Sequence, residues 1–137
     1  MKMTATARRA AVLAFCAFIF YLSSRSEFPD IKPWYPGWLP DPSLIAHFCL
    51  YTALALTVWN DFRAEPAAWL SRRAPYFTVI FCILYGLSDE YHQMFVPNRH
   101  FDPNDLAIDA VGAAAAMVFI ALLRRINKNR QKPIKET

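Results

Sequence analysis

Six polar side chains of this 137-residue sequence lie within or beside long apolar stretches, where an ionisable group is costly unless it has a partner. They comprise one imidazole, three carboxylic acids, one amide and one guanidinium: His47, Glu90, Asp105, Asp109, Gln93 and Arg99. Carboxylic acids in apolar surroundings can serve as acid and base, an imidazole can relay protons, and a guanidinium can hold an anion. The residue types therefore predict either a ligand-binding site or an acid–base site.

The spacing of these residues predicts that each helix presents them on one face. Asp105 and Asp109 are four residues apart, and Glu90 and Gln93 are three apart, as expected for neighbours on one side of a helix. Counted from the predicted helix ends, His47, Glu90 and Asp109 all lie within about 10 Å of the same edge of a hydrocarbon core. Three helices are thus expected to bring polar groups to one layer, in a shared pocket that opens outward.

Two glycines are expected to bring two of these helices together. Gly86 and Gly112 each lie one helical turn deeper than a carboxylic acid, namely Glu90 and Asp109. In lipid, small residues allow helix backbones to approach closely. We therefore expect close packing between the third and fourth helices.

Four apolar stretches must position these residues. The chain is 55% hydrophobic and only 19% charged, and residues 10–24, 42–60, 74–88 and 110–123 contain no Asp, Glu, Lys or Arg. A soluble helical bundle would show a polar stripe in such stretches, because one face of each helix meets water. The sequence therefore predicts an all-α polytopic membrane protein with a single domain. Its four transmembrane helices are expected at about 7–24, 42–60, 76–95 and 104–123, followed by a basic cytoplasmic tail at 124–137.

The third and fourth stretches are too short to cross a membrane alone. A helix needs about 20 residues to span the hydrocarbon core. These two stretches reach that length only when they include the acidic residues at their ends, among them Asp89, Glu90, Asp105 and Asp109. The short apolar length is therefore the reason to expect acids below the membrane surface.

The distribution of basic residues predicts the orientation. Most of the 15 Lys and Arg residues lie at the N-terminus, in the loop at 61–73 or after residue 123, and the exceptions are Arg25, Lys32 and Arg99. Because basic segments are retained in the cytoplasm, both termini are predicted to be cytoplasmic and the acid-rich side to face outward.

The first apolar stretch has an alternative interpretation. Lys2, Arg8 and Arg9 precede an apolar run at 11–22, and this order is also found in a cleaved signal peptide. The residues after the run form a poor small-residue cleavage site. Retention as a membrane span is the interpretation that we favour.

Several other classes of function are disfavoured. The net charge of +4 comes from membrane-flanking residues. We therefore expect membrane lipid as a partner and no nucleic acid. The three cysteines fall one to a span, without the spacing of a disulfide framework or a thiolate site. No nucleotide-binding or zinc-protease motif is present, and we expect no cofactor and no metal. An oligomer remains compatible with the sequence.

A purely structural role is the alternative for several of the polar residues. Asp102 and Asp105 precede or begin a predicted helix, where a carboxylate can cap unpaired amides. His47 can act as a neutral hydrogen-bond donor between helices. Glu90 and Asp109 lie deeper, where even a structural role requires a partner.

Three segments together resemble the signature of the VanZ-like family. Residues 88–99 read SDEYHQMFVPNR, and residues 105–112 read DLAIDAVG. His47-Phe48, followed by Tyr51 and Leu54, is similar to a third family element in the second span. The resemblance covers about residues 10–123. It departs from the family at Asn98, where Gly is common, and at Ser43-Leu44, which replace the usual Asp-Lys pair.

The resemblance implies a small four-span protein of the bacterial cytoplasmic, or inner, membrane. The family's named member is associated with resistance to teicoplanin, a lipid-tailed glycopeptide antibiotic that acts on cell-wall precursors outside the membrane. The signature positions in this sequence would be His47, Glu90, Gln93, Arg99, Asp105 and Asp109.

Three hypotheses of function follow. The first is an envelope protein that affects glycopeptide susceptibility. Its outward pocket would bind an amphiphilic or lipid-linked ligand, and Arg99 would contact the anionic group of that ligand. The second is a membrane-embedded hydrolase or transferase, in which Glu90 and Asp109 act as acid and base and His47 or His92 acts as proton shuttle or metal ligand. The third is a structural scaffold. No residue is assigned a catalytic role by the sequence alone.

Overall fold

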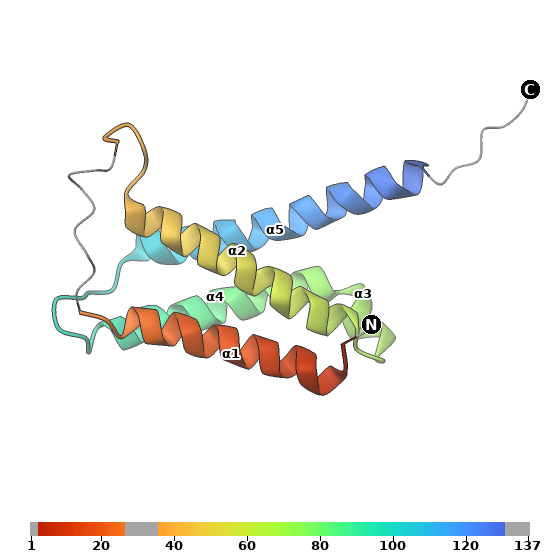
Figure 1. Ribbon diagram of the computed structural model, residues 1–137, viewed down its shortest axis with the longest axis horizontal. Coiled ribbons are helices and arrows are strands. Elements are labelled where there is room, and N and C mark those ends of the chain that lie inside the picture. Colours follow the sequence, from red (N-terminus) through yellow and green to blue (C-terminus); the bar gives the residue numbers. More distant parts are fainter. Residues whose placement is uncertain (1–2, 27–35, 131–137) are drawn as a thin grey trace, which may run out of the picture.

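The computed structural model describes residues 3–26 and 36–130, which form five α-helices and, within those ranges, no strand (Figure 1). The helices are α1 (Ala5–Ser23), α2 (Pro42–Arg63), α3 (Ala68–Arg72), α4 (Ala74–Gln93) and α5 (Pro103–Arg130). The all-α prediction is confirmed. Lys2, Lys32 and the last seven residues of the predicted basic tail lie outside the described residues.

The four long helices run side by side in alternating directions (Figure 1). The start of α1 meets the end of α2 through two ion pairs, Arg8 Nε to Asp61 Oδ1 at 3.3 Å and Arg9 Nη2 to Glu65 Oε1 at 2.8 Å. We call this end of the molecule, which also holds α3 and the end of α5, the basic end. The opposite end, where α2 and α5 begin and α4 finishes, is called the acidic end.

The core lies between α2, α4 and α5. Tyr51, Leu54 and Val58 of α2 are almost fully buried and pack with Cys82 of α4 and with Ala113 of α5. Small residues on α5 allow its backbone to approach α2, as expected for helices in lipid. Arg63 and Arg124 both lie over the Trp59 ring, at 4.9 and 4.7 Å from its centroid, and join α2 to α5 near the basic end.

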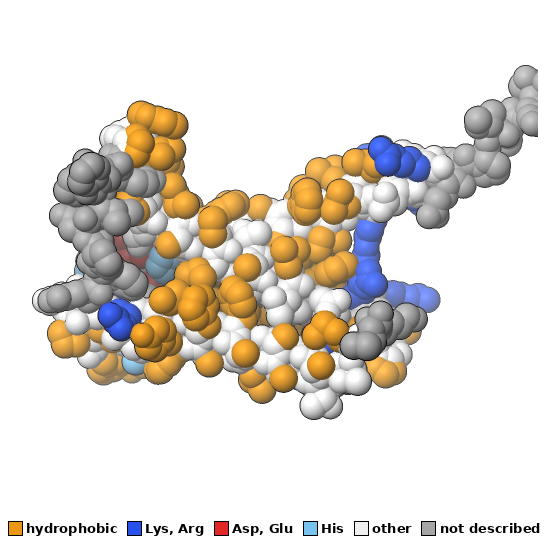
Figure 2. Space-filling view, viewed as in Figure 1, with side chains coloured by type: hydrophobic (Ala, Val, Ile, Leu, Met, Phe, Trp, Pro, Cys, Tyr) orange, Lys and Arg blue, Asp and Glu red, His pale blue; other side chains and the backbone are white. Residues whose placement is uncertain are grey.

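The outer surface of the bundle is apolar. Large hydrophobic side chains are exposed on every long helix, including Leu13, Leu56, Leu84 and Phe119. Figure 2 shows apolar side chains spread over the middle of one face, with Lys and Arg gathered towards the basic end. Three helices, α1, α2 and α5, are long and apolar enough to cross a membrane. These features are those of a membrane protein.

Aspartates cap the starts of α2 and α5. Asp41 caps α2 by accepting a hydrogen bond from the Ser43 amide at 2.8 Å, with Pro42 as the first helical residue. Asp102 accepts in the same way from the Asn104 amide at 2.8 Å, at the start of α5. The capping role considered for Asp102 from the sequence is confirmed.

The two glycines contact different helices. A Cβ at Gly86 would lie 2.9 Å from Asp109 Oδ2, so Gly86 does bring α4 against α5 as predicted. A Cβ at Gly112 would instead lie 2.7 Å from the Phe48 carbonyl oxygen of α2. The expectation that Gly112 packs against the third span was wrong, because α5 contacts two helices at this depth and Gly112 faces the other one.

Candidate functional site

The His47 ring lies between two carboxylates of α5. Its Nδ1 is 3.0 Å from Asp109 Oδ1, within hydrogen-bond distance, and its Nε2 is 3.5 Å from Asp105 Oδ2. His47 is in the second turn of α2, and both aspartates lie in the first two turns of α5. Because α2 and α5 start at the same end of the bundle, residues about 60 positions apart in the chain meet there.

Glu90 is fully buried beside this group and is held through both carboxylate oxygens. Its Oε2 accepts a hydrogen bond from the Asp102 amide at 2.9 Å, and its Oε1 accepts one from Gln93 Nε2 at 3.2 Å. Gln93 Nε2 also lies 3.4 Å from Asp89 Oδ2. These bonds connect the last turn of α4 to the start of α5 and fix the Glu90 side chain.

A cavity of about 370 Å³ opens beside the His47 ring, between α1, α2 and α4. One part of its wall is apolar and is formed by Ile19, Leu22, Pro42, Ala46 and Leu50. The other part is polar and is formed by Ser23, Ser43, His47, Tyr51, Asp89, Gln93 and Arg99. We call it the amphiphilic cavity.

Two polar groups in the wall of the amphiphilic cavity lack a partner. The Tyr51 hydroxyl and Asp89 Oδ1 are buried and accept or donate no hydrogen bond among the described residues. A buried polar group without a partner is costly, and a bound molecule can satisfy it. Both groups belong to residues that line the cavity.

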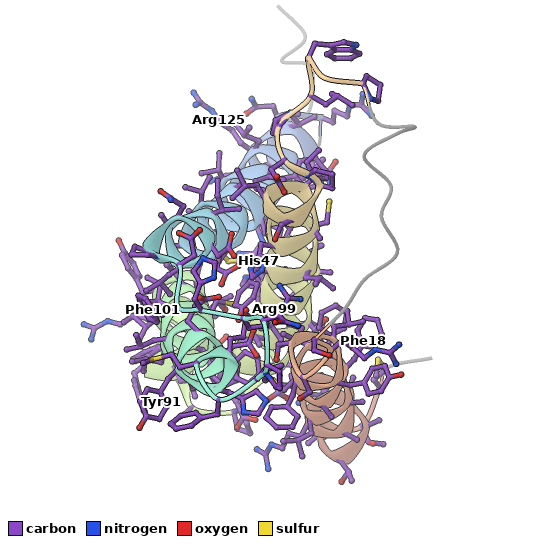
Figure 3. All side chains as sticks on the ribbon, turned by 90° about the vertical axis from the view of Figure 1, so that its left-hand side faces the viewer. Phe18, His47, Tyr91, Arg99, Phe101 and Arg125 are labelled. Atoms are coloured by element: carbon purple, nitrogen blue, oxygen red, sulfur yellow. The ribbon has the colours of Figure 1, made fainter. Side chains whose placement is uncertain are left out.

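A second cavity, of about 550 Å³, lies at the rim of the acidic end. Asp105 and Asp102 line it, and Ser43, Gln93 and Arg99 line both cavities. Figure 3 looks onto this end and shows His47 and Arg99 within the space that the helices enclose, whereas Tyr91 lies at the periphery. Arg99 donates from Nε to the Arg25 carbonyl oxygen at 3.2 Å, which connects the loop after α4 to the end of α1.

The structure brings all six predicted site residues to the acidic end, but in different positions. His47, Gln93 and Arg99 line the amphiphilic cavity, and Asp105 lines the rim cavity. Glu90 and Asp109 lie behind these walls, fully buried, and contact the lining residues rather than the cavities.

His92 lies away from the group. Its ring packs on Phe20 of α1, with centroids 4.3 Å apart, and its Nε2 is 3.0 Å from the Ser24 hydroxyl. Sequence reasoning offered His92 as an alternative to His47, and the geometry favours His47. Reasoning from the sequence did not include Ile19 and Ser23 of α1 as cavity residues, because that helix carries no polar pattern that would mark it.

Asn98 has a backbone conformation that explains its departure from the family pattern. Its φ is 62°, in the left-handed region that Gly adopts most easily. Asn is among the non-glycine residues that tolerate this region best. The loop before Arg99 therefore adopts this conformation without a glycine.

A comparison with protein families gives a match over most of the chain. The model of the family described as VanZ/LLP1 matches residues 10–124. The chain belongs to the VanZ/LLP1 family. Searches of the curated proteins and of the solved structures with this chain found no match. The part of the chain that matches VanZ/LLP1 includes all six site residues and both cavities, so the acidic end is part of the family region.

Proposed function

We propose that the chain spans the bacterial cytoplasmic membrane four times, with α4 crossing it in addition to α1, α2 and α5, and with the acidic end outside. The 20 residues of α4 match the membrane thickness, and α4 runs antiparallel to α5 within the bundle. Its polar residues gather in the last turns, at the acidic end. The basic residues at the opposite end support a cytoplasmic position for that end.

At the acidic end, the amphiphilic cavity is proposed to bind an amphiphilic or lipid-linked ligand. The observation that carries the proposal is the composition of its wall, apolar along α1 and α2 and polar beside His47, Gln93 and Arg99. A lipid with a polar head group has the same two-part character. Binding sites for such molecules are usually apolar cavities with a few well-placed polar groups.

The polar wall favours a particular head group. Arg99 can hold an anionic group such as a phosphate, because a guanidinium forms two parallel hydrogen bonds to it. Asp89 Oδ1 and the Tyr51 hydroxyl can bond to hydroxyl or amide groups of the same head group. A lipid-linked sugar phosphate combines both kinds of group. We further propose that this binding affects glycopeptide susceptibility, because such antibiotics act on lipid-linked cell-wall precursors.

The test is binding of a fluorescent polyprenyl phosphate to the purified chain in nanodiscs. Arg99→Gln is expected to weaken binding at least tenfold, because a charge-assisted bond to the phosphate is lost. Arg25→Gln is the matched control, since Arg25 is a basic residue at the same end that does not line the amphiphilic cavity. Equal affinity for all three proteins would contradict the proposal.

A second candidate function is a membrane-embedded hydrolase or transferase. It is favoured by the His47–Asp109 pair, in which a buried carboxylate orients an imidazole that lines the cavity. In that case His47 is the base, and Asp109 positions it. Turnover of a lipid-linked sugar phosphate by the wild-type chain, lost in His47→Gln, would favour this function over binding alone.

A further inference from the structure

Three side chains from three helices offer ligand atoms for a metal ion at the acidic end. His47 of α2, Glu90 of α4 and Asp105 of α5 each contribute one nitrogen or oxygen, and these atoms all lie within 4.8 Å of one another. We propose that they bind a divalent transition-metal ion. One imidazole and two carboxylates are suited to Mn²⁺ or Zn²⁺. The ion would lie between the two cavities, since His47 lines one and Asp105 lines the other.

The His47 ring is oriented as in a metal site. Asp109 Oδ1, 3.0 Å from Nδ1, is placed to accept the Nδ1–H proton, and this leaves the lone pair of Nε2 directed at Asp105 Oδ2. A carboxylate behind a histidine is the usual outer partner of a metal-bound imidazole. In this arrangement Asp109 positions the ligand and is not itself a ligand.

The distance between Nε2 and Asp105 Oδ2 fits two ligands of one ion. It is 3.5 Å, beyond the usual range of a hydrogen bond, which ends near 3.2 Å. Two ligand atoms that each lie about 2.1 Å from a tetrahedral ion are about 3.4 Å apart. The separation of this pair therefore fits two ligands of one tetrahedral ion.

Glu90 is positioned in the same manner. The Asp102 amide and Gln93 each donate a hydrogen bond to one of its carboxylate oxygens, and the side chain is fully buried. Metal-ligating carboxylates are commonly held by such outer bonds. Two of the three proposed ligands thus have dedicated positioning partners.

Charge and an unpartnered oxygen provide independent support. Glu90, Asp105 and Asp109 surround one imidazole, so in their ionised forms these three acids carry more negative charge than a protonated ring can balance. Asp109, whose side chain is 1% exposed, has no hydrogen-bond partner at Oδ2 among the described residues. Burying uncompensated charge is costly, and a divalent cation lowers that cost. The ion site does not depend on the proposed amphiphile binding.

The test is Mn²⁺ binding to the purified full chain after removal of metals with a chelator. We expect one Mn²⁺ per chain, with modulation of its electron spin echo by a histidine ¹⁴N. Glu90→Gln and Asp105→Asn are expected to weaken binding at least tenfold, and Asp109→Asn about tenfold, as for other outer partners. Asp41→Asn is the matched control, because it removes a carboxylate at the same end outside the ligand group and should bind as the wild type does.

Three results would overturn the proposal: no Mn²⁺ bound to the wild-type chain, bound Mn²⁺ without ¹⁴N modulation, or ligand variants that bind as tightly as Asp41→Asn. If a ligand variant does not fold, the ¹⁴N signal of the wild type still decides whether a histidine is a ligand. Loss of that signal in His47→Gln, with His92→Gln unchanged, would assign it to His47.

Discussion

At the scale of the residue, Gly86 and Gly112 each lie where another helix comes within contact distance of the backbone. A Cβ at Gly112 would meet a backbone carbonyl at 2.7 Å, and a Cβ at Gly86 would meet the Asp109 side chain at 2.9 Å. A carbonyl in a helix cannot move aside, whereas a side chain can shift slightly. The two positions should therefore differ in how much substitution costs.

We predict that Gly112→Ala destabilises the chain more than Gly86→Ala does. Overpacking of this kind typically costs about 1–3 kcal/mol, and Gly112→Ala should lie at the upper end. Gly37→Ala is the control, because a Cβ there would have no neighbour within 4 Å. The free energy of unfolding in mixed detergent micelles is the measurement. An unchanged value for Gly112→Ala would mean that α2 and α5 pack less closely than described.

The sequence predicts which polar residues lie at the same depth, because depth follows from counting residues along each helix. Counting along the predicted helices placed His47, Glu90 and Asp109 in one layer, and the structure has them there. Which helix Gly112 would contact could not be predicted, because that depends on how the helices are arranged around the bundle. The cavity residues of α1 could not be predicted either, because no polar pattern along that helix marks the face that lines the cavity.

At the scale of the element, the start of α1 is fixed to the end of α2 by charge. Arg8 and Asp61 are both largely buried, with side chains 12% and 13% exposed, whereas Arg9, in the neighbouring pair with Glu65, is 61% exposed. Exposed ion pairs contribute little to stability, because water and salt screen them. The less exposed pair should therefore couple the two helices more strongly.

A double-mutant cycle can measure this difference. We predict a coupling free energy of about 1 kcal/mol for Arg8→Gln with Asp61→Asn, and a smaller one for Arg9→Gln with Glu65→Gln. The coupling free energy is measured from unfolding in detergent at low salt. As the salt concentration rises, the coupling of the Arg9–Glu65 pair should decrease before that of the Arg8–Asp61 pair does. Equal coupling energies would show that burial does not distinguish the two pairs.

The long helices could be predicted from apolar stretches and prolines, because these features determine where a helix in lipid starts and ends. The helix expected at 76–95 is found at Ala74–Gln93, and the one expected at 42–60 continues to Arg63. The short helix α3, at Ala68–Arg72, was not predicted, since five residues carry too little periodicity. The helix expected at 104–123 continues to Arg130, and the Arg and Lys residues after the apolar stretch favour helix.

At the scale of the whole molecule, the segregation of charge leads to a prediction of orientation. In a variant without Cys16, Cys49 and Cys82, we expect Gly37→Cys to react with a membrane-impermeant maleimide in intact cells. Ala64→Cys should react only after permeabilisation, because it lies at the basic end. Both positions are exposed, so the extent of labelling reports the side of the membrane. Labelling in the reverse pattern would place the acidic end in the cytoplasm.

The length of α5 has a practical consequence for experiments on the intact protein. Its 28 residues extend about 42 Å, some 12 Å more than a hydrocarbon core, and its last turns carry Lys128 and Arg130. Figure 1 shows this part of α5 diverging from the other helices. In the proposed orientation, a fluorescent or affinity tag joined after α5 would stand clear of the lipid head groups, on the opposite side of the membrane from both cavities. Carboxyl-terminal fusions are therefore the suitable format for assays of the acidic end.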